Sequence, residues 1–174
     1  LLAAGKGERT KFQKQFAIIG QLPIWRIALD NIRFHSACHS VIVVFPQKAN
    51  IDQTFFKENP QIDWVYGGNT RSASVWNALK FHSKSSSKKP YVAIHDAARP
   101  ILPHAVLERL IVQLQKGEKA VIPVLDTIDT IKKFSGAHIS KTLKRNELVS
   151  AQTPQMFETE IIKNSYKNLF LETQ

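Results

Sequence analysis

The sequence predicts an α/β fold in which a mostly parallel sheet lies between helices. Three apolar runs, at residues 41–45, 62–66 and 91–94, have the composition of buried parallel strands. The stretches between them carry apolar side chains at helical spacing, and most connections are short. This alternation of strand and helix is typical of a sheet that is covered on both faces.

The remaining elements complete the same alternation. Leu1–Ala4 is interpreted as a first strand that begins before Leu1, and residues 120–122 as a later short strand. In chain order, we expect helices after Pro23, over about residues 49–58, after a cap at or near Thr70, over residues 103–115 up to Gly117, and near residues 158–170. Residues 124–150 are polar and basic without a clear period, which predicts an arm that leaves the body.

Composition narrows the choice of partner. The chain has 174 residues, which fits one domain over 1–174, and its 24 Lys and Arg against 14 Asp and Glu give a net charge of +10. This charge predicts an anionic partner, such as nucleic acid, an acidic membrane surface or a phosphorylated small molecule. A single cysteine, Cys38, excludes an intrachain disulfide and fits the cytoplasm. No apolar run has the roughly 18 residues of a membrane span, so we expect no membrane contact.

A glycine-rich segment follows the first strand. Gly5 and Gly7 allow backbone amides to approach a triphosphate, and Arg9 and Lys14 can neutralise charge that develops during nucleotidyl transfer. A tight turn beside a solvated basic loop would have the same pattern. The segment is neither a Walker A loop, which ends in Gly-Lys-Ser/Thr, nor the dinucleotide fingerprint, which has a third glycine.

Two more polar segments follow strands, at Gly67–Val75 and His95–Pro100. Asn69 and Ser74 are suited to contact a base edge, although an ordinary turn and helix cap would look alike. Asp96 can hold Mg²⁺ and Arg99 can bind a phosphate, unless the two form a buried pair that shapes the loop. His95 is interpreted as structural. Because ligands of parallel sheets bind at the carboxyl ends of the strands, the three loops should build one site.

The predicted arm and the segment after it carry hydroxyl groups and an arginine. Thr127, Thr130 and Arg145 lie in the arm, and Thr153 follows it. Together they can bind a second phosphate. A solvated basic β-ribbon is the alternative interpretation.

The order of five motifs resembles the 2-C-methyl-D-erythritol 4-phosphate cytidylyltransferases of the non-mevalonate isoprenoid pathway. These are Leu-Ala-Ala-Gly-x-Gly-x-Arg, Gly-Gly-x-x-Arg-x-x-Ser-Val, His-Asp-Ala-Ala-Arg-Pro, Pro-Val-x-Asp-Thr and Gln-Thr-Pro-Gln-x-Phe. The resemblance covers nearly the whole chain and includes fused bifunctional members. It departs at Gln13, where the family has Pro, and at the end, where the family's last strands would follow Gln174.

The resemblance implies a Rossmann-like nucleotidyltransferase fold with a dimerisation arm, and transfer of CMP from CTP to a phosphorylated sugar alcohol with a divalent ion, Mg²⁺. Arg9 and Lys14 would be catalytic. The nucleotide pocket would comprise Ala3, Ala4, Gly5, Gly68, Asn69, Ser74 and Asp96, with Asp96 also near the metal. The phosphosugar would contact Arg99, Thr127, Arg145 and Thr153, where Thr127 and Arg145 serve the other subunit of a homodimer.

Three alternatives remain at this stage. Asp129-Thr130 fits the Asp-Thr motif as Asp126-Thr127 does, and the preceding Pro123-Val124 favours Thr127. Ribitol 5-phosphate is the substrate of a related cytidylyltransferase with similar motifs. A nucleic-acid-binding module would fit the charge, but the basic residues are scattered and lack an interleaved aromatic platform, so we expect no nucleic acid.

Overall fold

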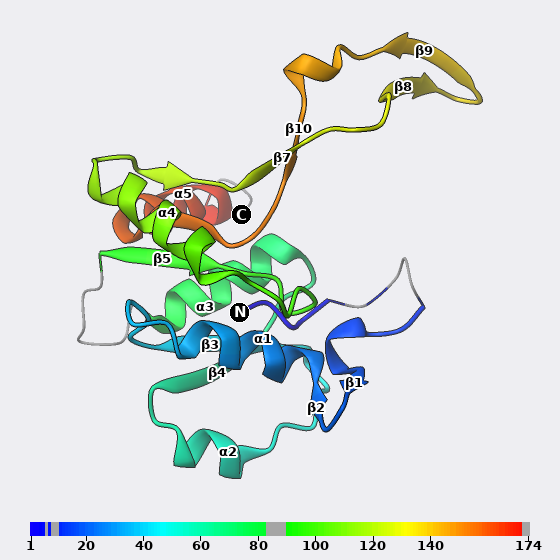
Figure 1. Cartoon of the computed structure of the whole chain (residues 1–174). Helices are drawn as coiled ribbons and strands as arrows, with labels where there is room; N and C mark the ends of the chain where they lie inside the picture. The colour runs from blue at the N-terminus through cyan, green and yellow to red at the C-terminus, as the bar shows by residue number, and fades with distance from the viewer. Residues whose placement is uncertain (6, 8–10, 83–89, 172–174) are drawn as a thin grey trace.

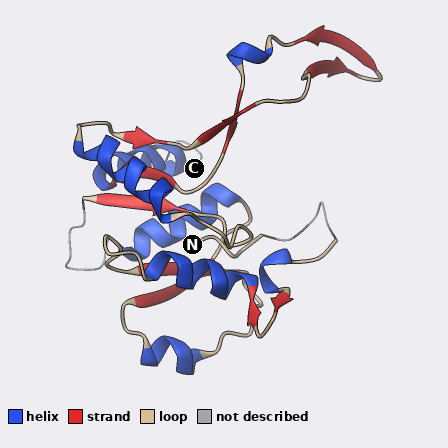
Figure 2. Cartoon of the chain, viewed as in Figure 1, coloured by secondary structure: helices blue, strands red, loops and turns tan. Residues whose placement is uncertain are grey.

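The computed structural model describes residues 1–5, 7, 11–82 and 90–171 (Figure 1). Strands and helices alternate along the body of the chain, as predicted (Figure 2). The body strands are β3 (Val41–Phe45), β4 (Ile62–Tyr66), β5 (Tyr91–Ile94), β6 (Ala120–Val121) and β11 (Gln155–Glu158). The helices are α1 (Ile24–Arg33), α2 (Gln53–Glu58), α3 (Arg71–His82), α4 (His104–Gln115) and α5 (Thr159–Leu171).

The sheet is mostly parallel, which confirms the predicted fold class. β3 pairs in parallel with β4, and Leu2 bridges in parallel to Val44 and to Asp96, so the N-terminal segment lies between β3 and β5. β11 is antiparallel to both β5 and β6. The order across the sheet is therefore β4, β3, the N-terminal segment, β5, β11 and β6. The sequence did not predict β11, because we expected no element between the arm and the last helix near residues 158–170.

Helices bury apolar side chains on both faces of this sheet. On one face, Leu29 of α1 packs with Val43 and Phe45 of β3, and Leu107, Leu110 and Leu114 of α4 pack with Met156 of β11. On the other face, Val75 and Leu79 of α3 pack with Ile94 of β5 and Ile162 of α5. The alternation of Met156 and Phe157 between the two faces follows from the two-residue period of a strand. Leu29 and Val43 are fully buried.

A small substructure connects the glycine-rich segment to α1. The 3₁₀ turn η1 (Lys14–Phe16) precedes a hairpin of β1 (Ile18–Ile19) and β2 (Leu22–Pro23). Gly20 takes a φ of 64° in the two-residue hairpin loop, a conformation that favours glycine. Ring stacking of Phe16 on Phe45 attaches the turn to the core. Strands of two residues have no readable period, so the sequence does not predict this hairpin.

Residues 124–150 form the predicted arm, which projects from the body (Figure 1). β7 (Val124–Asp126) pairs with β10 (Val149–Ala151), and β8 (Lys132–Ser135) pairs with β9 (His138–Thr142) beyond it. The short turn η2 (Arg145–Glu147) links β9 to β10. At the base, the Gln152 N–H donates to the Pro123 carbonyl at 2.8 Å.

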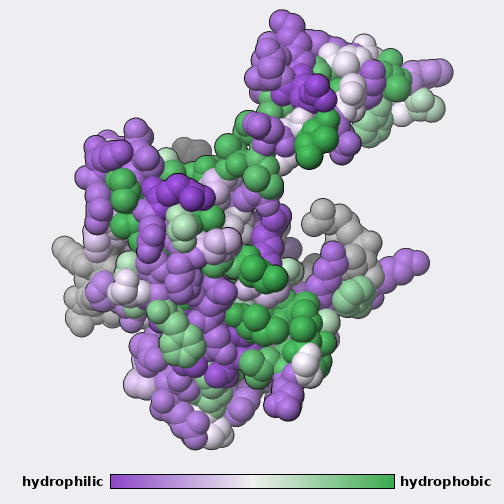
Figure 3. Space-filling model, in the orientation of Figure 1, coloured by the Kyte–Doolittle hydropathy of each residue, from purple (hydrophilic) through white to green (hydrophobic). Residues whose placement is uncertain are grey.

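The arm exposes many apolar side chains. Ile128, Phe134 and Ile139 are 85%, 75% and 67% exposed, so these residues have almost no cover within the chain. Figure 3 shows hydrophobic residues beside hydrophilic ones on the projecting arm. Within the described ranges, no helix is long and apolar enough to cross a membrane.

Candidate functional site

Three loops at the carboxyl ends of parallel strands enclose a pocket of about 610 Å³. The loops follow the N-terminal segment, β4 and β5, which confirms the predicted convergence. The pocket is lined by Leu2, Ala4, Gly5, Gly7, Lys14, Gln15, Gly68, Asn69, Thr70, Arg71, Ser74, Asp96 and Ala98.

The glycine-rich segment forms one wall. Gly7 has a φ of 70°, and a Cβ there would lie 2.0 Å from the Phe12 carbonyl oxygen, so only glycine fits this close approach. Lys14 lies on the same wall at the start of η1. Ala3 is buried directly behind the wall, where its N–H donates to the Val44 carbonyl at 2.8 Å. Arg9 lies outside the described residues.

The loop after β4 forms a second wall that depends on two glycines. A Cβ on Gly67 would lie 2.6 Å from the Ala4 Cβ, and a Cβ on Gly68 would lie 2.4 Å from the Ala73 Cβ. The loop can therefore close against its neighbours only without side chains at these positions. Ser74 holds it, because its hydroxyl accepts from the Gly68 N–H at 3.1 Å and donates to the Thr70 carbonyl at 2.9 Å.

The same loop starts α3 and presents polar groups to the pocket. The Thr70 hydroxyl accepts from the Ala73 N–H at 3.0 Å, which confirms Thr70 as the predicted helix cap. Asn69 lines the pocket beside it. Ser74 is almost fully buried with its hydroxyl engaged by the backbone, so in this structure it shapes the loop.

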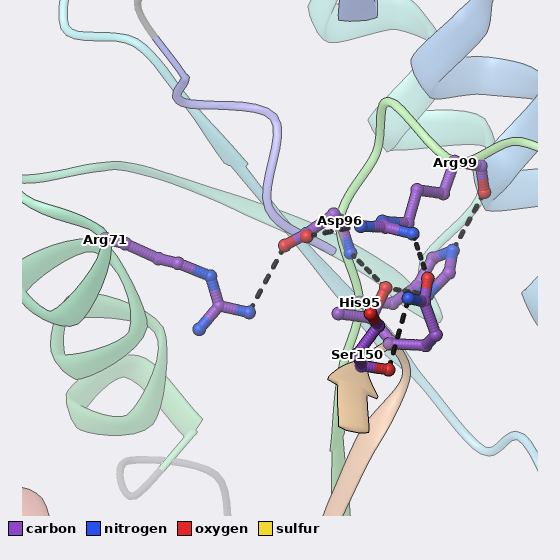
Figure 4. Close-up of polar contacts among 7 residues, drawn as sticks. Arg71, His95, Asp96, Arg99 and Ser150 are labelled. Carbon is purple, nitrogen blue, oxygen red and sulfur yellow. Dashed lines mark hydrogen bonds and ion pairs between the residues drawn. The ribbon is translucent and has the colours of Figure 1, made fainter. Parts of the chain in front are cut away.

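Two arginines approach the carboxylate of Asp96 from different elements (Figure 4). Arg71 at the start of α3 lies 3.2 Å from one oxygen, and Arg99 in the loop after β5 lies 3.7 Å from the other. The Asp96 side chain is 34% exposed, so it is accessible from the pocket rather than sealed in a buried pair. Two positive charges and one negative charge leave this side of the pocket with a net charge of +1.

A buried hydrogen-bond chain fixes the loop that carries Asp96. The ring Nε2 of His95 donates to the Arg99 carbonyl at 2.9 Å, because a carbonyl oxygen can only accept. The other ring nitrogen, Nδ1, then accepts from the Thr153 hydroxyl at 3.0 Å, and that hydroxyl faces the Asp96 N–H at 3.4 Å. Burial lowers the pKa of His95 and keeps the ring neutral. These contacts agree with the structural role predicted for His95.

The residues assigned to the phosphosugar lie in two separate places. Arg99 and Thr153 lie beside Asp96, and the Arg99 guanidinium also donates to Gln152 (Figure 4). Thr127 and Arg145 lie on the arm and do not line the pocket of their own chain. Arg145 donates to the Ile128 carbonyl at 2.9 Å, within the arm.

Five residues line the pocket although nothing in the sequence assigned them to it: Leu2, Gln15, Thr70, Arg71 and Ala98. Arg71 stands inside the second glycine motif, and its position one residue after the Thr70 cap signals that it starts a helix beside the loop. Gln15 follows the candidate Lys14 directly. For Gln15 the sequence offers no other signal, because its role depends on contacts ten and twelve residues away.

The family model for 2-C-methyl-D-erythritol 4-phosphate cytidylyltransferase (IspD) matches residues 1–173. The chain belongs to this family. A cytidylyltransferase of this name from Rhodococcus opacus (strain B4) is 33% identical over 168 residues, which cover 94% of this chain and 72% of that protein. The "Bifunctional enzyme IspD/IspF" of Rhizobium etli (strain CIAT 652) is 34% identical over an alignment of 176 positions that covers 96% of this chain. The chain spans 43% of the length of that bifunctional relative.

Solved structures of the cytidylyltransferase family have the same fold. The 4-diphosphocytidyl-2C-methyl-D-erythritol synthase of Anaerococcus prevotii matches with a TM-score of 0.78 and 26% identity, over 98% of this chain and 73% of that one. The bifunctional IspDF of Campylobacter jejuni matches with a TM-score of 0.76 and 28% identity, over 95% of this chain and 41% of that one. Both likenesses cover nearly the whole of this chain.

Proposed function

We propose that this chain transfers CMP from CTP to 2-C-methyl-D-erythritol 4-phosphate and releases pyrophosphate. The observation that supports this most directly is the convergence of two glycine loops, Lys14 and the Asp96 carboxylate on one pocket, in a chain of the cytidylyltransferase family. We assign the activity to the cytoplasm, which fits a lone Cys38 and a nucleoside triphosphate substrate.

The reaction requires positioning and positive charge more than a strong base. A phosphate oxygen of the sugar phosphate attacks the α-phosphorus of CTP, a new P–O bond forms, and the bond to the bridging oxygen of the β-phosphate breaks. Negative charge accumulates on the α-phosphate and on the leaving pyrophosphate. Lys14 on the pocket wall and Arg9 in the same segment would stabilise that charge.

The nucleotide would occupy the pocket between the two glycine loops. Ala4 and Gly5 form one wall, and Gly68 and Asn69 form the opposite one. Ala3, which was assigned to the same pocket, is buried behind its wall, and the almost fully buried Ser74 lines the pocket and holds the loop through its hydroxyl. In this arrangement backbone groups and the Asn69 amide would form hydrogen bonds with the edge of the cytosine base.

Magnesium fits this site as an ion shared with the substrate. Among the residues that the structure describes, no group of three or more His, Cys, Asp or Glu side chains is placed to hold a metal. Mg²⁺ commonly uses one or two carboxylates and completes its shell with water and substrate phosphates. The partly exposed Asp96 carboxylate would supply one such ligand, and magnesium chemistry there would be neutralisation of the triphosphate charge.

The phosphosugar would lie on the Arg99 side of Asp96, with Thr153 beside it. Thr127 and Arg145 are on the arm, so we propose that they complete the pocket of a second subunit in a homodimer. The exposed Phe134 and Ile139 support this assignment, because apolar side chains left uncovered on a projecting arm are typical of a subunit interface.

A substrate comparison tests the proposal. Purified protein is incubated with CTP, Mg²⁺ and either 2-C-methyl-D-erythritol 4-phosphate or ribitol 5-phosphate, and pyrophosphate release is followed. We expect release with the methylerythritol phosphate and none when the metal is chelated. Pyrophosphate release with ribitol 5-phosphate alone would favour the related cytidylyltransferase. Tighter binding of nucleic acid than of CTP at physiological salt would favour a nucleic-acid-binding module.

A further inference from the structure

Gln15 is a buried amide that spans two carbonyls of the glycine-rich wall. Its side chain is almost entirely enclosed, and Nε2 donates to the Ala3 carbonyl at 2.8 Å and to the Gly5 carbonyl at 2.7 Å. An amide nitrogen carries two hydrogens, so both are used. The two acceptors flank Ala4, the residue at which the first strand becomes the wall of the pocket.

The turn that carries Gln15 directs three consecutive side chains to three places. A 3₁₀ turn has three residues per turn, so its successive side chains point about 120° apart. Phe16 stacks on Phe45 of the core with the ring centroids 6.3 Å apart, and Gln15 binds the glycine-rich wall. Lys14 is left on the remaining side, where it lines the pocket.

We infer that Gln15 is a positioning residue that fixes Lys14 against the glycine-rich wall. Without the Gln15 bonds, η1 loses its two side-chain hydrogen bonds to the glycine-rich wall, and Lys14 can move relative to Ala4 and Gly5. This inference rests on the proposed function, because it assigns Gln15 to the same nucleotide pocket. It requires a donor amide: a glutamate of equal size would place acceptors against two acceptor carbonyls.

Gln15→Met tests the inference, since methionine keeps the length of the side chain and removes both donors. We expect kcat to fall by up to about 100-fold with a smaller change in KM for CTP, because misplaced groups cost turnover more than ground-state binding. Gln15→Glu is the second variant and should lose as much. Gln13→Met is the control, because Gln13 is exposed and precedes the same turn. It should turn over as the unmodified protein does.

A double-variant cycle separates positioning from general support of the fold. If Gln15 acts through Lys14, Gln15→Met should lower turnover much less in a Lys14→Met background than in the unmodified protein. A purely structural role would give multiplied losses and a matching fall in the thermal midpoint.

Unmodified protein without pyrophosphate release would refute the proposed function itself. Normal turnover by Gln15→Met, or losses that simply multiply with those of Lys14→Met, would overturn the inference alone. If Gln15→Met does not fold, Gln15→Glu is taken through the same cycle.

Discussion

The guanidinium of Arg71 lies 3.2 Å from the carboxylate of Asp96, although the two residues are 25 positions apart in the chain. Arg71 starts α3 and Asp96 follows β5, so the contact connects two of the three loops around the pocket. Both side chains are partly exposed, at 47% and 34%. The position of the pair beside the pocket is that of a functional contact. Because both side chains are partly exposed, the pair should contribute little to the free energy of unfolding.

Arg71→Met should separate these two contributions. An ion pair this exposed contributes about 0–1 kcal/mol to stability, so the free energy of unfolding should change by no more than that. Pyrophosphate release should fall by about ten-fold or more, because a cation beside the reacting phosphates is lost. Denaturant unfolding and steady-state kinetics measure the two effects. Arg109→Met, on the exposed side of α4, is the matched control and should change neither.

The buried His95 predicts a pH dependence of stability. Its pKa is lowered in the folded protein, chiefly by burial, so the unfolded chain binds its proton more readily. The free energy of unfolding should be insensitive to this group above about pH 6.5, the ordinary histidine value, and should decrease as the pH falls below it. Denaturant unfolding between pH 7.5 and 5 would record the decrease at roughly half-unit steps.

His95→Asn isolates this contribution from that of other groups. The pKa of His82 is also lowered, first by burial, and it persists in both proteins, so it cancels in the difference. The variant should be less stable at neutral pH because it loses the bonds to Arg99 and Thr153. Below about pH 6.5 its stability should decrease less steeply than that of the unmodified protein. Parallel curves would show that His95 does not titrate on unfolding in this range.

Arg9→Ala should lower turnover by about 100-fold while CTP binding changes much less. This pattern is expected for a contact that strengthens as charge develops on the transferred phosphate. Calorimetric titration with CTP and Mg²⁺ measures affinity, and single-turnover pyrophosphate release measures the chemical step. An equal loss in both quantities would place Arg9 in ground-state binding instead.

Mixing two inactive variants tests whether the arm completes the neighbour's site. If the arm completes the neighbour's site as proposed, Lys14→Ala would disable the pocket of its own chain, and Arg145→Ala would disable the pocket of its partner. In mixed dimers one of the two sites combines an intact pocket with an intact arm. Random exchange at equal amounts should therefore restore about a quarter of the activity. Activity that stays at the level of the separate variants would assign Arg145 to its own chain or to no site.

The sequence predicted the body of the fold because its strands are mostly apolar and, in β3, buried on both faces. The run 41–45 is continuously apolar, the run 62–66 is apolar except for Asp63, and the structure places β3 and β4 at the same bounds. β11 was not predicted, because only Met156 and Phe157 of its four residues are apolar. It forms a strand because it pairs with β5 and β6. β1 and β2 are too short to show any period.

The candidate site was predictable where it depends on local backbone demands. At Gly67 and Gly68 the backbone lies too close to neighbouring atoms for a side chain. A glycine pair directly after a strand indicates such a close approach, so this part of the site could be predicted. Contacts between distant segments were not predictable. Neither the Arg71–Asp96 pair nor the hydrogen bonds from Gln15 to Ala3 follow from spacing, because they arise only when separate strands are brought side by side.

The hydrogen bond between Gln152 and Pro123 closes the base of the arm, so the segment enters and leaves the body at one point. β6 and β11, the strands on either side of this base, pair with each other in the sheet. The arm is thus a modular insertion whose ends are already joined. Its length and surface can diverge between homologues, or be exchanged for a short turn in an engineered variant, while the loops that form the pocket keep their framework.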